Sequence, residues 1–112
     1  MIYGIGTDLV EIDRIEDAHS EKFINRILTG KEIERYNGLK TEKRKIEYLA
    51  GRFAAKEAFV KALGTGIGEV SFQDIEILSS GGKPVCNYKD FKCHVTISHT
   101  DEYAVAFVLL EK

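Results

Sequence analysis

Proline and cysteine are scarce in this 112-residue sequence, which contains one proline and two cysteines. Two cysteines are too few for a disulfide framework, and Cys86 and Cys93 have neither CxxC spacing nor the spacing of a zinc site. We therefore expect two reduced, half-buried thiols. No proline-rich linker, internal repeat or low-complexity run divides the chain, so a single domain is expected over residues 1–112.

Long apolar runs and a strong net charge are absent as well. No segment is long enough to cross a bilayer, and residues 1–6 contain neither a basic segment nor the apolar core of a signal peptide. The formal net charge of −2 gives no global reason to bind nucleic acid or an anionic membrane. We expect a cytoplasmic protein without nucleic-acid or membrane partners, in which any anion site is local.

The hydrophobic pattern changes period along the chain and predicts both strands and helices. Period-2 alternation indicates strands over residues 2–8, 72–78 and 93–98, and residues 85–88 can return from a turn as a hairpin strand. Residues 103–110 are apolar on both faces, as in a central strand. Helices are expected over residues 10–28, in two pieces broken near His19, then over 31–36 and 45–63. The expected fold class is α+β, with one antiparallel sheet packed by a long central helix and shorter helices.

Local signals mark where the helices begin and end. Thr29 and Glu32 match the T-x-x-E capping box, which places a helix start just after Thr29. The charged segment 40–45 reads as the solvated start of the long helix, with Thr41 as a possible N-cap. Gly64 follows Leu63 and is expected to end that helix.

Glu57 is the first residue that needs an explanation. At about 100° per residue, it falls near the middle of the apolar face of the long helix. The other members of that face are Ile46, Leu49, Ala50, Phe53 and Val60. A carboxylate there costs several kcal/mol unless a cation or hydrogen-bond donors compensate it. Lys61 lies four residues further on. The glycines that follow expose backbone N–H groups, so this region suggests a place for a metal and phosphates.

A simpler interpretation of the same residues stays open. Glu57 can pair with Lys61 at the edge of a core helix, and Gly64 can be an ordinary C-cap. Asp8 closes a strand face that it shares with Gly4 and Gly6, where glycines often mark the close approach of another backbone or a ligand. Asp8 can equally be a plain N-cap for the next segment.

Three cations occupy the first helical region. Arg14, Lys22 and Arg26 form either a solvated face or a docking surface for an acidic partner. The residues alone favour the solvated face.

Taken together, four motifs resemble those of the holo-(acyl-carrier-protein) synthases, the short-chain phosphopantetheinyl transferases. They are G-I-G-T-D near the start, R-F-A-A-K-E-A-F-V-K-A with its glycine tail, G-K-P, and I-S-H-T near the end. The resemblance covers essentially the whole chain and keeps the order of the motifs. It implies the 4′-phosphopantetheinyl transferase fold and transfer of the 4′-phosphopantetheine arm from coenzyme A to a serine of apo acyl carrier protein. The other product would be adenosine 3′,5′-bisphosphate, and the setting would be fatty acid biosynthesis.

The resemblance also implies roles for particular residues. Asp8 and Glu57 would hold Mg²⁺ together with the diphosphate of coenzyme A, and these oxygen ligands are those that Mg²⁺ prefers. Lys61 would stabilise charge during phosphoryl transfer. The serine proton would go to Glu57 or to a water on the metal. Residues expected to bind the nucleotide are Arg52, Lys56, Gly64, Gly66, Lys83, Pro84, Ser98, His99 and Thr100. Arg52 and Lys56 are expected outside the apolar face of the helix.

Partners follow from the resemblance too. The resemblance implies a homotrimer whose active sites lie between subunits. Carrier proteins are acidic, which makes Arg14, Lys22 and Arg26 a plausible docking face. The segment between Arg14 and Phe23 is a few residues shorter than in many relatives, so Lys22 and Arg26 rest on charge alone.

Two other functions compete with the transferase. A non-catalytic module that binds coenzyme A or a nucleotide would need the glycine loop and Lys61 but no second carboxylate. A purely structural oligomer would contain an ordinary Glu57–Lys61 pair and bind no nucleotide. Both leave the joint occurrence of Asp8 and Glu57 in these motifs unexplained.

Overall fold

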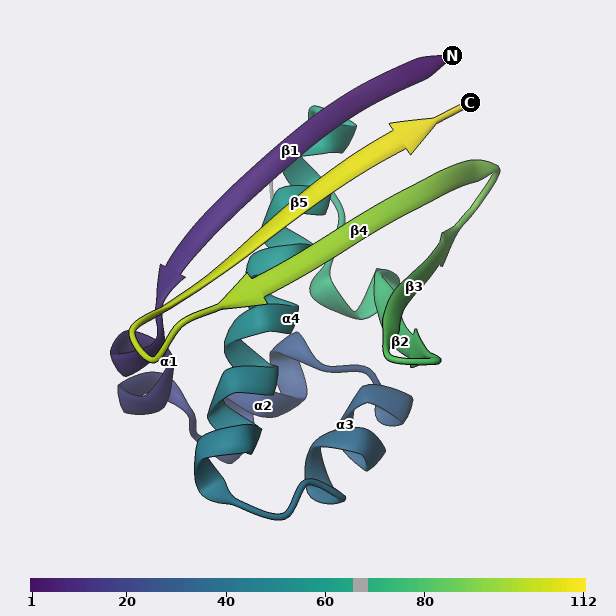
Figure 1. The fold of residues 1–112 in the computed structure, drawn as a ribbon. Coiled ribbons are helices and arrows are strands. Elements are labelled where there is room, and N and C mark those ends of the chain that lie inside the picture. The colour runs from purple at the N-terminus through teal and green to yellow at the C-terminus, as the bar shows by residue number, and fades with distance from the viewer. Residues whose placement is uncertain (66–68) are drawn as a thin grey trace.

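A five-stranded antiparallel sheet curves around one long helix (Figure 1). The structure is a computed structural model that describes residues 1–65 and 69–112. The sheet has the order β1-β5-β4-β3-β2. Its strands are β1 (Ile2–Glu11), β2 (Glu76–Ser80), β3 (Lys83–Tyr88), β4 (Phe91–His99) and β5 (Tyr103–Glu111). The helices are α1 (Ile12–Ala18), α2 (Glu21–Ile27), α3 (Gly30–Asn37), α4 (Glu42–Leu63) and the short 3₁₀ turn η1 (Phe72–Asp74). The predicted α+β class with an antiparallel sheet is confirmed.

The two faces of the sheet differ. Along β5, Ala104, Ala106, Val108 and Leu110 are buried and face α4, while Val105 and Phe107 alternate with them and are exposed. β1 pairs with β5 so that Asp8 lies opposite Ala106, which places Asp8 on the α4 side. The side chains of Ile5 and Leu9 point the other way and are exposed. One apolar sheet face is therefore covered by α4, and the other is open in the single chain.

Helix α4 begins and ends where the sequence predicts. The Thr41 hydroxyl accepts a hydrogen bond from the Arg44 backbone N–H, and Gly64 adopts a left-handed φ of 80° as C-cap. The sequence predicted a single apolar face on α4. The helix is instead buried on several sides, because it is surrounded by β1, β4, β5 and the other helices. Arg52 and Lys56 are buried, so the prediction that they lie outside the buried face was wrong.

Two glycines allow β1 to lie directly on α4. A Cβ atom at Gly6 would lie 2.0 Å from the Ala58 carbonyl oxygen, and one at Gly4 would lie 2.0 Å from the Ala62 carbonyl oxygen. Any side chain at either position would push the strand off the helix. The glycines thus mark the close approach of a backbone, and this contact sets how near Asp8 comes to α4.

The short helices also match most of their sequence signals. The predicted break at His19 and Ser20 separates α1 from α2. The Thr29–Glu32 capping box is present, with the Thr29 hydroxyl accepting from the Glu32 N–H and the Glu32 carboxylate accepting from the Thr29 N–H.

Several strand boundaries differ from the prediction, and two of them differ by three residues or more. β1 continues three residues beyond Asp8 to Glu11, because residues 9–11 pair with β5. Residues 72–74 form η1 instead of the start of a strand, since the Asp74 carboxylate accepts from the Ser71 N–H and closes a turn. Both cysteines are free thiols, with Cys86 buried and Cys93 half-buried.

A buried ion pair links α4 to the segments around it. The Lys56 ammonium lies 2.6 Å from a Glu32 carboxylate oxygen, and both side chains are fully buried. It also donates to the carbonyl oxygens of Ile27 and Phe72, at 2.7 and 3.1 Å. The Glu32 carboxylate accepts in addition from the Ile77 N–H. Burial lowers the pKa of Lys56, although the charge of Glu32 opposes that shift. Within the described part of the chain, no helix is long and apolar enough to cross a membrane.

Replacing Gly6 by alanine should separate β1 from α4. Because the new methyl group would meet a backbone oxygen that cannot rotate away, Gly6→Ala is expected to lower the free energy of unfolding by about 3 kcal/mol or more. Urea denaturation measures the loss. Gly30→Ala is the matched control, since nothing lies within 4 Å of a Cβ atom there. Equal stability of the two variants would contradict the packing argument.

Replacing Lys56 by methionine should leave the Glu32 carboxylate buried without its cation. Breaking a buried pair from one side costs about 3–5 kcal/mol, so a loss of that order is expected in the same unfolding measurement. Lys43→Met removes a lysine whose ion pair with Asp101 is exposed, and it should change stability little. A Lys56→Met protein as stable as the Lys43→Met protein would show that the buried pair does not hold the fold together.

Candidate active site

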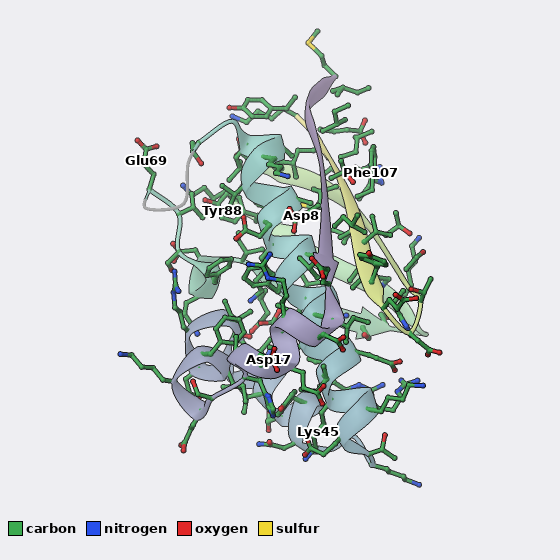
Figure 2. The ribbon with its side chains drawn as sticks, turned by 90° about the vertical axis from the view of Figure 1, so that its left-hand side faces the viewer. Asp8, Asp17, Lys45, Glu69, Tyr88 and Phe107 are labelled. Atoms are coloured by element: carbon green, nitrogen blue, oxygen red, sulfur yellow. The ribbon has the colours of Figure 1, made fainter. Side chains whose placement is uncertain are left out.

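Asp8 and Lys61, from β1 and α4, meet at the surface beside Glu57. The Lys61 ammonium lies 3.1 Å from an Asp8 carboxylate oxygen and donates to the Thr7 carbonyl oxygen at 2.9 Å. The Asp8 side chain is 17% exposed, whereas the Lys61 side chain is 57% exposed. Figure 2 shows Asp8 where β1 crosses α4. The structure therefore brings together the three residues predicted to be catalytic.

Glu57 is a half-buried carboxylate whose protonation is affected by its surroundings. Its pKa is raised, first by burial and then by the negative charge of Asp8, while the cations Lys61 and Arg26 act in the opposite direction. Within the described residues, Lys61 forms its ion pair with Asp8 and not with Glu57. The simple Glu57–Lys61 pair is thus not what the structure contains.

The two carboxylates fit a hard divalent cation. The negative charge of Asp8 favours protonation of Glu57, and a bound cation would relieve the repulsion between the two carboxylates. Among the described residues, no cluster of three or more acidic, histidine or cysteine side chains could hold a metal. Mg²⁺ commonly binds to one or two carboxylates and takes its other ligands from water and substrate phosphates. Asp8 and Glu57 offer such a partial ligand set.

A pocket of about 470 Å³ opens beside these carboxylates. Asp8 and Glu57 line it together with apolar side chains that include Ile15, Phe23 and Phe53. Arg14 from α1 also lines this pocket, so it lies close to the carboxylates. Lys22 and Arg26 are exposed on α2. The Arg26 guanidinium lies 5.7 Å from the centre of the Phe72 ring, and its charge reaches Glu57.

A second pocket, of about 810 Å³, lies between α3, α4 and the ends of β2, β3 and β4. Three of the predicted nucleotide-binding residues line it: Arg52, Pro84 and His99. The Arg52 guanidinium is fixed by the Ile77 carbonyl oxygen, the Ser79 hydroxyl and the face of the Tyr48 ring. A rigid, charged donor group therefore forms one wall of this pocket.

Sequence reasoning missed three further cations of the second pocket, which are Lys31, Arg35 and Arg44. Lys31 and Arg35 are four residues apart on α3, and Arg44 lies eight residues before Arg52 on α4. This helical spacing is the signal that could have found them. The sequence interpretation had treated segment 40–45 as solvated. Four cations around one pocket make it a candidate anion site.

The remaining predicted residues lie elsewhere. Lys56 lies in the interior, paired with the Glu32 carboxylate. Its ammonium group is therefore not accessible to a nucleotide at the surface, contrary to the prediction. Gly64 forms the C-cap of α4, and Gly66 lies outside the described residues. Lys83 and Ser98 are exposed on β3 and β4. Thr100 is a turn residue whose hydroxyl accepts from the Glu102 and Tyr103 N–H groups.

The two pockets lie on different sides of α4. Phe53 and Glu57 line the first, whereas Tyr48, Gly51 and Arg52 line the second. At about 100° per residue, Arg52 and Glu57 point about 140° apart around the helix. One chain therefore presents its carboxylate pair and its cationic pocket in different directions.

Comparison with known proteins gives this arrangement a context. Residues 4–108 match the 4′-phosphopantetheinyl transferase superfamily. A holo-(acyl-carrier-protein) synthase of Staphylococcus haemolyticus is 53% identical over 100% of this chain and 98% of its own length. The S. aureus (strain Newman) protein of the same name is 54% identical over the same shares.

Solved structures agree with this similarity. The holo-(acyl-carrier-protein) synthase of Bacillus anthracis, in complex with CoA (3′,5′-ADP), is 51% identical with a TM-score of 0.92, over 98% of this chain and 96% of that chain. The Helicobacter pylori enzyme in complex with coenzyme A is 34% identical with a TM-score of 0.84, over 96% and 99%. The family predicted from the four motifs is confirmed. This chain belongs to the holo-(acyl-carrier-protein) synthases of the 4′-phosphopantetheinyl transferase superfamily.

Proposed function

We propose that this chain, as a single domain over residues 1–112, transfers the 4′-phosphopantetheine arm of coenzyme A to a serine of apo acyl carrier protein. Holo carrier protein and adenosine 3′,5′-bisphosphate are the products. The observation that carries the proposal is the Asp8–Lys61–Glu57 cluster beside an open pocket. Its support from known proteins is that the family is named for this reaction and that two solved relatives contain coenzyme A or its nucleotide part.

Asp8 and Glu57 would hold Mg²⁺ between them. The metal would supply positive charge to the diphosphate of coenzyme A when both are bound. Lys61 supplies a second positive charge at the same place, since its ammonium lies on Asp8 and remains largely exposed to a ligand. Transfer of a phosphoryl-linked group depends on such charge neutralisation and alignment more than on covalent chemistry by the protein.

Glu57 is the residue of this chain suited to accept the proton of the attacking serine. Burial and the neighbouring Asp8 charge raise the pKa of Glu57 in the metal-free protein, and a bound Mg²⁺ would oppose that shift. The position of Glu57 in the pocket, more than its basicity, is therefore what suits it to this role, and a water on the metal is the alternative base. Glu57 lines the pocket that Arg14 also lines, so a serine presented there meets Glu57 directly.

The cationic pocket is suited to the nucleotide end of coenzyme A. Lys31, Arg35, Arg44 and Arg52 provide positive charge, and Arg52 is held rigidly by its own hydrogen bonds. His99 and Pro84 complete the wall near the strand ends. The volume of about 810 Å³ is within the usual range for a site that encloses a drug-sized ligand.

Arg14, Lys22 and Arg26 form the docking face for the carrier protein in this proposal. Arg14 lines the carboxylate pocket and the other two are exposed on the adjacent helix α2. An acidic carrier would be steered toward these cations and would present its serine next to Glu57.

The active enzyme is a homotrimer in this proposal. The sheet face turned away from α4 exposes large apolar side chains, including Ile5, Leu9 and Phe107, with Leu9 63% exposed. Contiguous exposed apolar surface of this kind usually marks an interface. A neighbouring copy packed on this face can bring its cationic pocket toward Asp8 and Glu57, two regions that a single chain points in different directions.

Removing either carboxylate should abolish transfer. Mass spectrometry of apo acyl carrier protein incubated with the enzyme, coenzyme A and Mg²⁺ should show a mass gain of one phosphopantetheine arm. Asp8→Ala, Glu57→Ala and EDTA should each reduce the initial rate at least about a hundredfold. Asp90→Asn, an exposed aspartate in the β3–β4 turn, is the matched control and should retain the wild-type rate. Coenzyme A binding in calorimetry without any transfer would instead support the non-catalytic module.

A charge on the open sheet face should dissociate the trimer. Phe107→Glu would place a carboxylate in the buried interface, where an unpaired charge is costly, so analytical ultracentrifugation should detect monomers. Lys40→Glu alters an exposed lysine outside this face and should leave the mass of the assembly unchanged. A Phe107→Glu protein with the same assembly mass as wild type would rule out this face as the interface.

A further inference from the structure

A carboxylate stands among the cations of the second pocket. Glu47 lines this pocket beside Arg44 and Arg52, and its side chain is 11% exposed. A negative charge there repels the phosphate groups of a nucleotide. Its place in the pocket therefore needs a reason other than direct attraction of an anion.

The contact of Glu47 with His99 supplies that reason. A Glu47 carboxylate oxygen lies 3.7 Å from His99 Nδ1, and the His99 side chain is 44% exposed. The Thr100 carbonyl oxygen lies 3.4 Å from the same nitrogen. Both neighbours of Nδ1 are acceptors, which favours a proton on that nitrogen. Nε2, on the opposite edge of the neutral ring, is then a hydrogen-bond acceptor available to a donor group of a ligand.

A second contact joins the same helix to the same turn. The Lys43 ammonium lies 3.1 Å from an Asp101 carboxylate oxygen. Lys43 and Glu47 are four residues apart and so share one side of α4. His99 and Asp101 lie at the end of β4 and in the turn that follows it. Two polar contacts one helical turn apart thus connect α4 to the end of β4 and the turn that follows it.

We propose that Glu47 is a positioning residue for nucleotide binding, which acts by holding the His99 ring with its Nε2 acceptor toward a hydrogen-bond donor of the nucleotide, such as the adenine amino group. The inference rests on the proposed function of the pocket. Arg44 and Arg52 on the same helix line this pocket together with Glu47 and His99, as do Lys31, Glu34 and Arg35 of α3, and the Lys43–Asp101 pair lies at the adjoining turn. Glu47 is the member of this set that contacts the ring.

Orientation and charge predict opposite results when Glu47 is neutralised. Loss of a negative charge alone should strengthen binding of an anion. Loss of the constraint on His99 should weaken it, because an unrestrained ring must be ordered when the ligand binds. Glu34→Gln is the matched control, since Glu34 is an exposed carboxylate at the same pocket and should show the charge effect alone.

The experiment measures binding of adenosine 3′,5′-bisphosphate by calorimetry to wild type, Glu47→Gln, Glu34→Gln, His99→Ala and the Glu47→Gln/His99→Ala double variant. We expect Glu47→Gln to weaken binding about tenfold, and Glu34→Gln to bind as tightly as wild type or more tightly. In the His99→Ala background, Glu47→Gln should cause no further loss. In the transfer assay, Glu47→Gln should raise KM for coenzyme A and leave kcat close to wild type.

Three outcomes would overturn the inference. Glu47→Gln can bind the bisphosphate at least as tightly as wild type, which would show the charge effect alone. It can weaken binding equally with and without His99, which would mean that Glu47 contacts the ligand itself. It can also lower thermal stability to the extent that binding loss follows unfolding. A wild-type protein that neither binds the bisphosphate nor transfers the arm would overturn the proposed function instead, since the inference concerns only how an active pocket is ordered.

Discussion

The close contact of β1 with α4 determines where the reactive groups of this protein lie. Gly4 and Gly6 let the strand rest on the carbonyl oxygens of Ala62 and Ala58, at distances that exclude any side chain. Asp8, two residues after Gly6, therefore lies near Lys61 and Glu57 on the helix. The closeness of the two carboxylates is thus a consequence of backbone packing.

Neighbouring residues of α4 serve opposite purposes. Lys56 turns into the interior and joins α2, α3 and η1 through one ammonium group, while Glu57 turns toward the open pocket. Arg52 is also buried, yet its guanidinium reaches the wall of the cationic pocket. The helix is long and enclosed on most sides, and successive residues point about 100° apart around it. Neighbouring residues therefore lie in different environments, and one helix contributes to both pockets.

This enclosure explains what the sequence could and could not predict. Helix ends depend on local chemistry, so Thr29, Thr41 and Gly64 were identified correctly. The burial of Lys56 was not predicted, because a cation in a helix is expected to face solvent unless its partner is known. Its partner Glu32 is 24 residues away in the sequence. The cationic pocket was missed in part for the same reason. Its cations come from α3 and α4, and only the fold brings them together beside the ends of β2, β3 and β4. Glu57 attracted attention because a carboxylate on an apolar face conflicts with its surroundings, and Asp8 because it closes a strand face lined by glycines. Their joint role was implied by the resemblance of the motifs to a known family.

The different directions of the two pockets connect the single chain to its proposed assembly. In the proposed reaction, one ligand with a diphosphate and an adenine nucleotide would use both the carboxylate site and the cationic pocket, and this chain directs the two about 140° apart around α4. The open sheet face exposes apolar side chains next to β1, the strand that carries Asp8. Covering that face with a second copy would bury the apolar surface, and a copy that also reached around the edge strand β1 would come near Asp8 on the α4 side. Stability and completion of the active site would then come from one interface, which gives the small domain a physical reason to act as an oligomer.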